Sequence, residues 1–219
     1  MIPDLVRLAR PFAVLSVLGL AAGCVDLARD APERRLYAFE VRREGRDAAA
    51  GGSPLLEVRR LQDSPRSEGT CLLYRRSDTR FESDFYHQFV APTADLITEE
   101  VRSWLQGSGL FAGVIGSGSD AEPVYILDGV LSSLYADFRG DPPQAVLEAQ
   151  FFLIRNGPGP PALVLQRDYE EPMPLADASP EGLVRGWNEG LRIILGSLES
   201  DLRACLAPAT ALENPARGG

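Results

Sequence analysis

A possible catalytic set lies near the middle of the chain, where Ser83, Asp84 and His87 supply a hydroxyl, a carboxylate and the only imidazole of the sequence. These are the three groups of a serine hydrolase relay. A regular strand, however, places Ser83 and His87 on one face and Asp84 on the other. No nucleophile-elbow pattern accompanies the serine. The local sequence therefore favours a polar or interface role for His87, although a relay assembled from distant residues stays open.

Metal, cofactor and nucleic-acid sites are not predicted. One histidine and two widely separated cysteines, Cys71 and Cys205, do not form a zinc ligand set. The glycine-rich run 116–120 lacks the lysine and the following helix of a phosphate-binding loop. With a formal charge of −9, the chain lacks the clustered cations that nucleic acid requires.

The most informative chemical group is the thiol of Cys24, which ends the sequence Leu-Ala-Ala-Gly-Cys. Arg7 and Arg10 come first, an apolar run from 11 to 20 follows, and small residues come last, which is the order of an export signal. The run is shorter than the roughly 20 residues that span a bilayer. The segment resembles a lipoprotein signal, whose cysteine becomes the acylated N-terminus. An ordinary secretory signal that happens to carry a cysteine is the alternative.

The processing site divides the chain into four parts. Residues 1–23 are predicted to be the lipoprotein signal peptide, 24–33 a lipidated tether, 34–207 the folded domain and 208–219 a disordered tail. An oxidising periplasm would allow Cys71 and Cys205 to form a disulfide. Two buried small hydrophobic side chains are the other interpretation of these cysteines.

Hydrophobic periodicity predicts strands, a helix, further strands and a second helix. The first helix covers 93–106, with Thr93 or Asp95 as its cap, and the second covers 180–206, with Ser179 as its cap. Gly182, Gly186 and Gly190 form a smooth ridge that would let the second helix approach a neighbouring element closely. The strands are expected at 34–43, 55–61, 70–76, 81–89, 111–115, 124–138, 145–154 and 162–169.

Two local details accompany these strands. Gly129 suggests a bulge in the strand 124–138, and the turn-forming run 156–161 predicts an antiparallel hairpin. The element order indicates an α/β (α+β) fold: a two-layer domain with a mixed, largely antiparallel sheet packed against two main helices.

Aromatic side chains gather in the strand 81–89. Phe81, Phe85 and Phe89 are expected on one face and Tyr86 on the other. Core packing is the simplest interpretation of this group. A contact surface for a partner or for lipid is the alternative, and it makes these four residues candidate site residues.

The chain resembles the ABC-type transport auxiliary lipoprotein family, which includes paraquat-inducible protein C. The resemblance rests on a series of short motifs in the family's order: Tyr74–Asp78, Phe85–Pro92, Leu105–Val114, Tyr125–Gly129, Tyr169–Pro174 and Trp187–Leu191, following the lipoprotein signal. Phe89 departs from the tryptophan of many relatives but keeps an aromatic ring.

The resemblance implies a non-enzymatic lipoprotein of the cell envelope. Its expected partners are an MCE (mammalian cell entry) protein and an ABC transporter that move lipid between membranes. A homo-oligomer such as a ring is compatible with this role. Val25 follows Cys24 in place of the aspartate that retains lipoproteins at the inner membrane, so the outer membrane, on its periplasmic side, is expected. A periplasmic lipid shuttle, which needs an apolar cavity of roughly 300–1,000 Å³, and an envelope hydrolase are the alternatives.

Overall fold

The structure is a computed structural model that describes residues 33–49, 53–65 and 69–207. Its compact unit begins at Arg34. All side chains of the described hydrophobic core lie between Tyr37 and Leu206, so this unit carries its own core and can fold without the residues that precede it. The predicted signal peptide, Cys24 and the predicted tail after residue 207 lie outside the described residues.

The described residues form two helices and a nine-stranded mixed sheet, as the sequence predicted for the fold class. Three long strands, β7 (Tyr125–Asp137), β8 (Gln144–Arg155) and β9 (Ala162–Pro174), run antiparallel and make up one part of the sheet. The predicted hairpin is therefore confirmed, and β9 continues five residues beyond the expected end.

The other side of β7 pairs with three short strands in succession. These are β2 (Leu55–Val58), β3 (Gln62–Asp63) and β4 (Cys71–Arg75), all parallel to β7. Strand β6 (Gly113–Gly116) extends the sheet beyond β2. Beyond β4 lie β5 (Phe81–Phe89), which is antiparallel to β4, and β1 (Arg35–Tyr37), which is parallel to β5 and forms an edge. This arrangement puts the first residues of the compact unit beside β5.

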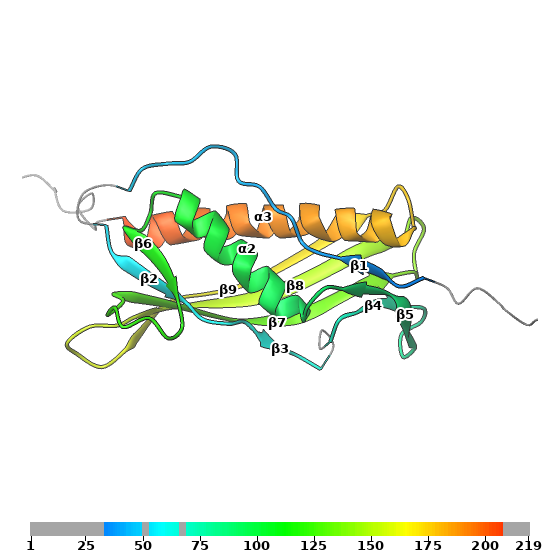
Figure 1. Ribbon diagram of the computed structural model, residues 1–219, viewed down its shortest axis with the longest axis horizontal. Helices are drawn as coiled ribbons and strands as arrows, with labels where there is room; N and C mark the ends of the chain where they lie inside the picture. Colours follow the sequence, from blue (N-terminus) through cyan, green and yellow to red (C-terminus); the bar gives the residue numbers. More distant parts are fainter. Residues whose placement is uncertain (1–32, 50–52, 66–68, 208–219) are drawn as a thin grey trace, which may run out of the picture. The chain divides into compact units, whose positions relative to one another are not determined.

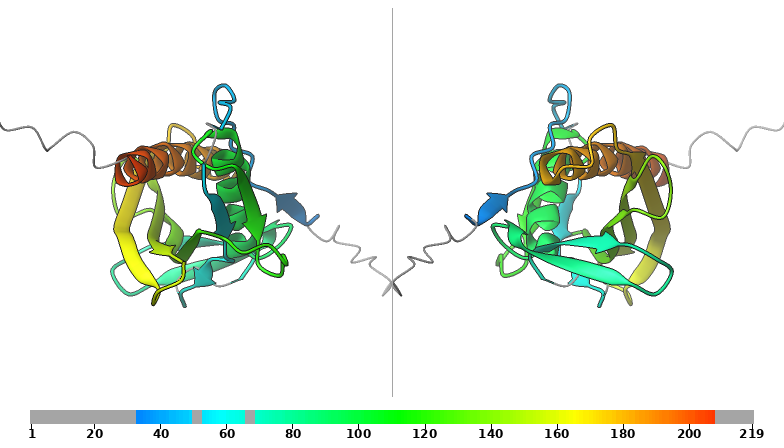
Figure 2. Two further views of the ribbon diagram at one scale, coloured as in Figure 1. Left: turned by 90° about the vertical axis from the view of Figure 1, so that its left-hand side faces the viewer. Right: turned by 90° about the vertical axis from the view of Figure 1, so that its right-hand side faces the viewer.

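Both helices cover the same face of the sheet (Figure 1). Helix α2 (Thr93–Gly107) and helix α3 (Pro180–Leu206) agree with the predicted helices within one residue. Seen along the sheet, β9 and β6 rise on opposite sides of the two helices, so the sheet curves around them (Figure 2). Trp187 of α3 is buried at the centre, where its indole N–H donates to the Val146 carbonyl at 3.0 Å.

The helix caps follow the prediction only in α3. The Ser179 hydroxyl accepts from the Gly182 amide at 3.1 Å, as expected of an N-cap. In α2 the N-cap position is Pro92, which has no side-chain acceptor, so the expectation that Thr93 or Asp95 caps this helix is wrong.

The glycine ridge of α3 does allow a close approach to the sheet. A Cβ on residue 186 would lie 2.8 Å from the Cβ of Ala145, and one on residue 190 would lie 3.4 Å from Cγ of Met173. Gly129 has a similar role in β7, since a Cβ there would lie 2.8 Å from the Gln150 carbonyl oxygen. The irregular pairing of β7 occurs between Leu131 and Ser133, so the bulge predicted at Gly129 is misplaced.

The segment 38–49, here called the arm, is not the continuation of the first strand that its apolar residues predicted. It runs across the helices without strand partners (Figure 1) and is held by their side chains and by the Gly107 carbonyl, which accepts from the Asp47 amide at 3.0 Å. The Glu40 amide donates to Oδ1 of Asn188 at 2.8 Å, and the Val41 amide donates to Oε2 of Glu100 at 3.1 Å. Because helices supply these acceptors, alternation of apolar residues alone could not distinguish the arm from a strand.

Arg43 fixes the arm most firmly. Its Nε donates to Glu199 of α3 at 2.8 Å, and the same carboxylate accepts from Nε1 of Trp104 at 2.8 Å and from Arg203 at 2.7 Å. Glu199 is only 6% exposed, so its charge is compensated almost wholly by these donors.

Candidate functional site

The strand β5 contains a bulge that pushes aromatic rings outward. Cys71 of β4 pairs with Gln88, but the next residue of β4, Leu72, pairs with Asp84. The three residues 85–87 therefore have no partners on β4, and the strand is displaced there. Phe85 and Tyr86, the first two of these residues, are both exposed.

Asp84 holds this bulge in shape. Its carboxylate accepts from the backbone amides of Tyr86 at 2.9 Å and His87 at 3.1 Å, and it also contacts Nδ1 of His87 at 2.8 Å. The Tyr74 hydroxyl donates to the same carboxylate at 3.0 Å. Burial tends to raise the pKa of Asp84, but the hydrogen bonds from His87, Tyr86 and Tyr74 outweigh it and keep the pKa below its usual range.

The bulge corrects the expected positions of the possible catalytic set. A regular strand would separate Asp84 from His87, yet the structure brings them into contact because the extra residues turn the chain between them. Ser83 still pairs with Leu73 on the face opposite to Asp84. The observed contacts of Asp84 and His87 therefore fix the local backbone and do not lead to the serine.

A second polar group attaches β1 to the start of α3. The Tyr37 ring stacks on the His87 ring with centroids 6.1 Å apart. The Tyr37 hydroxyl donates to Oε1 of Glu181 at 2.9 Å, and Arg35 donates to the same oxygen at 3.1 Å. Glu181 lies in the first turn of α3, where the helix dipole favours a negative charge. These contacts fix the edge strand against both β5 and α3.

The resulting surface is here called the aromatic edge and consists of Arg34, Leu36, Phe85, Tyr86 and Val90. Its four apolar members lie close together, because they belong to the paired strands β1 and β5 or directly follow β5. All four are exposed. The Phe85 and Tyr86 rings meet edge to face at 5.6 Å, and the Arg34 guanidinium lies 4.6 Å from the Phe85 centroid. The aromatic edge therefore combines apolar area with a cation.

The four aromatic residues predicted as contacts do not form one group. Phe85 and Tyr86 belong to the aromatic edge. Phe81 lies at the other end of β5, where its ring meets Tyr135 at 5.6 Å. Phe89 is buried and stacks on Phe39 at 4.9 Å, so the interpretation as core packing holds for this residue and the alternative of a contact surface does not.

The sequence alone did not identify Asp84, Leu36 or Val90 as parts of this site. A usable signal was present for Asp84, because aspartate side chains often accept from backbone amides two or three residues later and so mark a departure from strand geometry. Leu36 and Val90 look like ordinary strand residues, and only the pairing of β1 with β5 shows that they are exposed together.

Replacing Asp84 by asparagine is expected to loosen the bulge. The amide retains one acceptor oxygen and loses the charge, so the free energy of unfolding falls by about 1–2 kcal/mol. Hydrogen exchange of the Tyr86 and His87 amides, which donate to Asp84, is expected to accelerate. Ser83→Ala on the opposite face is the matched control. Equal exchange rates in the two variants would contradict the role of Asp84.

Cys71 and Cys205 are free thiols in the structure, so the predicted disulfide is not seen in it. Cys71 begins β4, whereas Cys205 lies in the last turn of α3, with its sulfur 3.7 Å from the Val164 carbonyl oxygen of β9. The alternative of two buried, unbridged cysteines is correct in that no bridge is present, but both side chains are only partly buried. Cys24, the predicted lipidation site, lies outside the described residues.

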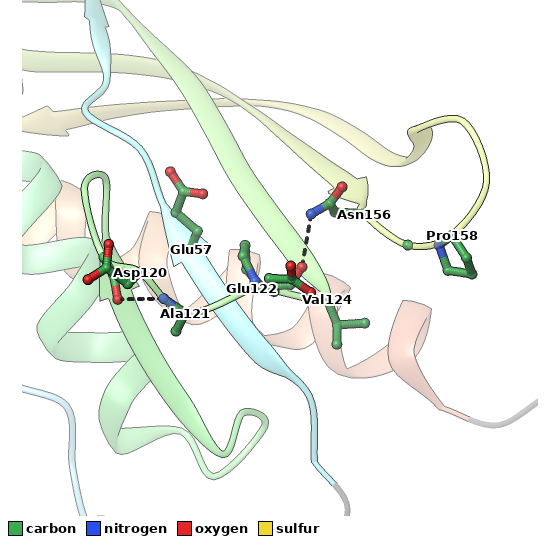
Figure 3. Close-up of a pocket in the computed structure, with 10 residues that line it drawn as sticks. Glu57, Asp120, Ala121, Glu122, Val124, Asn156 and Pro158 are labelled. Carbon is green, nitrogen blue, oxygen red and sulfur yellow. Dashed lines mark hydrogen bonds between the residues drawn. The ribbon is translucent and has the colours of Figure 1, made fainter.

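A surface cleft of about 750 Å³ lies between the turn before β7 and the β8–β9 turn. Glu57, Asp120, Glu122 and Asn156 contribute polar side chains to it, and the Asn156 side chain donates to the Pro123 carbonyl at 3.1 Å (Figure 3). Its size would suit a lipid, but its carboxylates do not suit acyl chains. The cleft therefore gives no support to a lipid shuttle.

The described residues contain neither a metal-ligand cluster nor a helix suited to cross a membrane. Within them, no three His, Cys, Asp or Glu side chains come together in a way that could hold a metal ion. No helix in this part of the chain has the length and apolar character that a bilayer crossing requires.

Comparison with family models gives no match, and comparison with curated proteins gives none either. Solved structures do match. The protein XCC0632 from Xanthomonas campestris, described with the family model DUF330, has a TM-score of 0.68 at 17% identity, over 78% of this chain and 95% of that chain. An uncharacterized protein has a TM-score of 0.62 at 12% identity, over 78% and 99% of the two chains. At these identities the comparisons show a shared fold.

Proposed function

We propose that this chain is a lipid-anchored envelope protein that works by contact, as an auxiliary component of an MCE-type ABC system for lipid transport. Cys24 carries the acyl chains, and the compact unit from Arg34 onward is the docking part. The outer membrane, on its periplasmic side, is the proposed location. The motifs from Tyr74 to Leu191 that resemble the auxiliary lipoprotein family support the choice of partner.

The observation that carries this proposal is the aromatic edge. Two aromatic rings are held outside the core by a bulge whose amides are satisfied by a carboxylate, so their exposure is built into the backbone. Exposed aromatic side chains supported by arginine are typical of contact surfaces. The aromatic edge also includes Arg34, where the compact unit begins, and so lies close along the chain to the proposed anchor.

The two alternative functions lack an observation of this kind. A lipid shuttle needs a cavity with an apolar lining, and the cleft of Figure 3 has carboxylates in its lining. A hydrolase needs a nucleophile within reach of a base, and the contacts of His87 observed here are to Asp84 and Tyr37. A membrane-anchored protein that works by surface contact therefore accounts for the exposed aromatic edge, which neither alternative explains.

The test combines acylation and capture in the native host. Cells are labelled with a palmitate analogue, and the tagged full chain is recovered from mildly solubilised envelope membranes. We expect the wild-type chain to carry the label and to bring down an MCE-domain protein, identified by mass spectrometry. Cys24→Ser is expected to lose the label, because no other cysteine is in the signal context.

Cys71→Ser is the matched control and is expected to keep both the label and the captured protein. A label that persists in Cys24→Ser would contradict the assignment of the anchor. Recovery of no transporter component with the labelled wild-type chain would contradict the proposed partner, whatever the state of the anchor.

A further inference from the structure

We propose that the aromatic edge is a membrane-contacting surface that inserts Phe85 and Tyr86 into the interface of the phospholipid layer to which the chain is anchored. This inference rests on the proposed function, since it presumes the anchor at Cys24, and it names a lipid surface as the occupant of the aromatic edge. The compact unit would then touch the membrane at two points: the acyl chains and these rings.

The first argument is chain length. The ten residues 24–33 separate Cys24 from Arg34, and even a fully extended chain of that length reaches only about 33 Å. Arg34 lies directly against the Phe85 ring. The aromatic edge is therefore confined to the neighbourhood of the lipid surface by covalent connection, whereas other exposed apolar residues of the unit are not confined in this way.

The distance along the sheet strengthens this contrast. Leu163 and Val164 are also exposed, but Leu163 pairs with Ile154, which pairs with Ile126 near the start of β7. The strand β4 joins β7 with Tyr74 opposite Ala136, and Leu72 of β4 pairs with Asp84 beside the bulge of β5. By this register the bulge lies about eight residues along β7 from Ile126, roughly 26 Å. The Leu163–Val164 pair is thus at the opposite end of the sheet, with β9 and the β8–β9 turn (Figure 1).

The second argument is the chemistry of the residues. Aromatic rings, and tyrosine in particular, favour the boundary between head groups and acyl chains, because one side is apolar and the other is wet. Arginine can keep its guanidinium at the head groups while its stem lies against apolar surface. In the aromatic edge the Phe85 ring contacts both Tyr86 and Arg34, which is the combination expected at this boundary.

The third argument is the local charge. The chain as a whole carries −9, which would repel an anionic lipid surface. Around the aromatic edge, however, Glu181 is paired with Arg35, and Asp84 is surrounded by hydrogen-bond donors. Binding would therefore depend on apolar insertion more than on charge attraction, and it should persist when salt screens the charges.

Because the bulge is rigid, insertion of the rings costs little conformational entropy. The amides of Tyr86 and His87 are already bonded to Asp84, and Tyr37 stacks on His87 from the β1 side. Because the backbone that presents the rings is ordered before contact, little further ordering accompanies binding.

The test uses the anchor-free unit from Arg34 to Gly219, which contains the described core, with vesicles of phosphatidylethanolamine and phosphatidylglycerol. Flotation is expected to recover the wild-type unit with the vesicles at both low and high salt. The double variant Phe85→Ser/Tyr86→Ser is expected to bind roughly tenfold more weakly or worse, because most of the inserting apolar area is removed.

The matched control is Leu163→Ser/Val164→Ser. Its two side chains are 57% and 36% exposed, close to the 60% of Phe85 and the 41% of Tyr86, and it is expected to float like the wild type. Thermal unfolding of all three proteins verifies that they are folded. Equal flotation of the aromatic variant and the wild type, equal loss in both variants, or no flotation of the wild-type unit would each overturn the inference.

Failure of this inference can be distinguished from failure of the proposed function. If the aromatic variant of the anchor-free unit floats like the wild-type unit, while the same variant of the full chain no longer captures the MCE-domain protein, the aromatic edge is a protein-docking surface and the membrane assignment is overturned. If the anchor-free unit binds vesicles through Phe85 and Tyr86 while the full chain captures no transporter component, the inference stands and the proposed partner is overturned.

Discussion

Glu199→Gln is expected to lower the free energy of unfolding by about 3 kcal/mol. The substitution keeps the shape of the side chain but removes the charge that compensates Arg43, and it turns a donor group toward other donors. Breaking a buried ion pair from one side leaves an uncompensated charge, which typically costs about 3–5 kcal/mol. Urea unfolding followed by circular dichroism measures the loss.

Glu189→Gln is the matched control for this prediction. Glu189 lies on the same helix and also pairs with an arginine, Arg192, but both side chains are about half exposed. Exposed pairs contribute about 0–1 kcal/mol. If the two variants unfold at the same urea concentration, the arm is not fixed by Glu199.

The same carboxylate gives the unfolding curve a pH dependence with a defined sign. The hydrogen bonds from Arg43, then those from Arg203 and Trp104, lower the pKa of Glu199 from 4.5 to about 2 against the opposing effect of burial. Its contribution is therefore complete above the unfolded pKa and is lost as the pH falls toward 2. The wild type and Glu199→Gln should become more alike in stability between about pH 5 and pH 2.

Gly186→Leu is expected to destabilise the fold by about 3 kcal/mol, since it forces bulk into a close contact between α3 and the sheet. A Cβ at this position already lies 2.8 Å from the Cβ of Ala145 and 2.9 Å from Cδ2 of Leu175. The Leu175 side chain can rotate away, but the Cβ of Ala145 is fixed to β8, so the helix itself must move. Chemical unfolding measures the change.

Gly196→Leu on the same helix is the matched control, and it is expected to change the free energy of unfolding in the opposite direction. Nothing lies within 4 Å of a Cβ at residue 196. Leucine has a higher helix propensity than glycine, so this variant is expected to gain up to about 1 kcal/mol. A Gly186→Leu variant as stable as Gly196→Leu would show that α3 does not need the glycine ridge.

The long elements could be predicted because their sequence signals are local. The stripe from Val184 to Leu202 and the capping hydroxyl of Ser179 are sufficient to place α3. The turn-forming residues between β8 and β9 specify the hairpin in the same way. In each case the residues that decide the structure lie within the element or beside it.

The arm and the bulge could not be predicted, because distant side chains decide them. The arm alternates like a strand, yet its amides bond to Glu100 and Asn188, which follow it by 59 and 148 residues. In β5 the hydrogen bonds of one side chain, Asp84, outweigh strand alternation and reverse the expected face of His87. The positions of most residues in the candidate site depend on such long-range or side-chain interactions. For this reason the sequence identified only Phe85 and Tyr86 of the aromatic edge.

The attachment of the arm has a mechanical consequence. If a partner pulls on the compact unit while acyl chains hold the membrane, the force enters at Arg34 and must pass through β1, which has only three residues paired with β5. After β1, the next ion pair that the chain makes with a helix is the one between Arg43 and Glu199. Under force the chain would therefore unfold in steps: β1 detaches from β5 first, and the ion pair resists next. Pulling at the proposed anchor would thus lengthen the linker to the membrane before it disrupts the hydrophobic core.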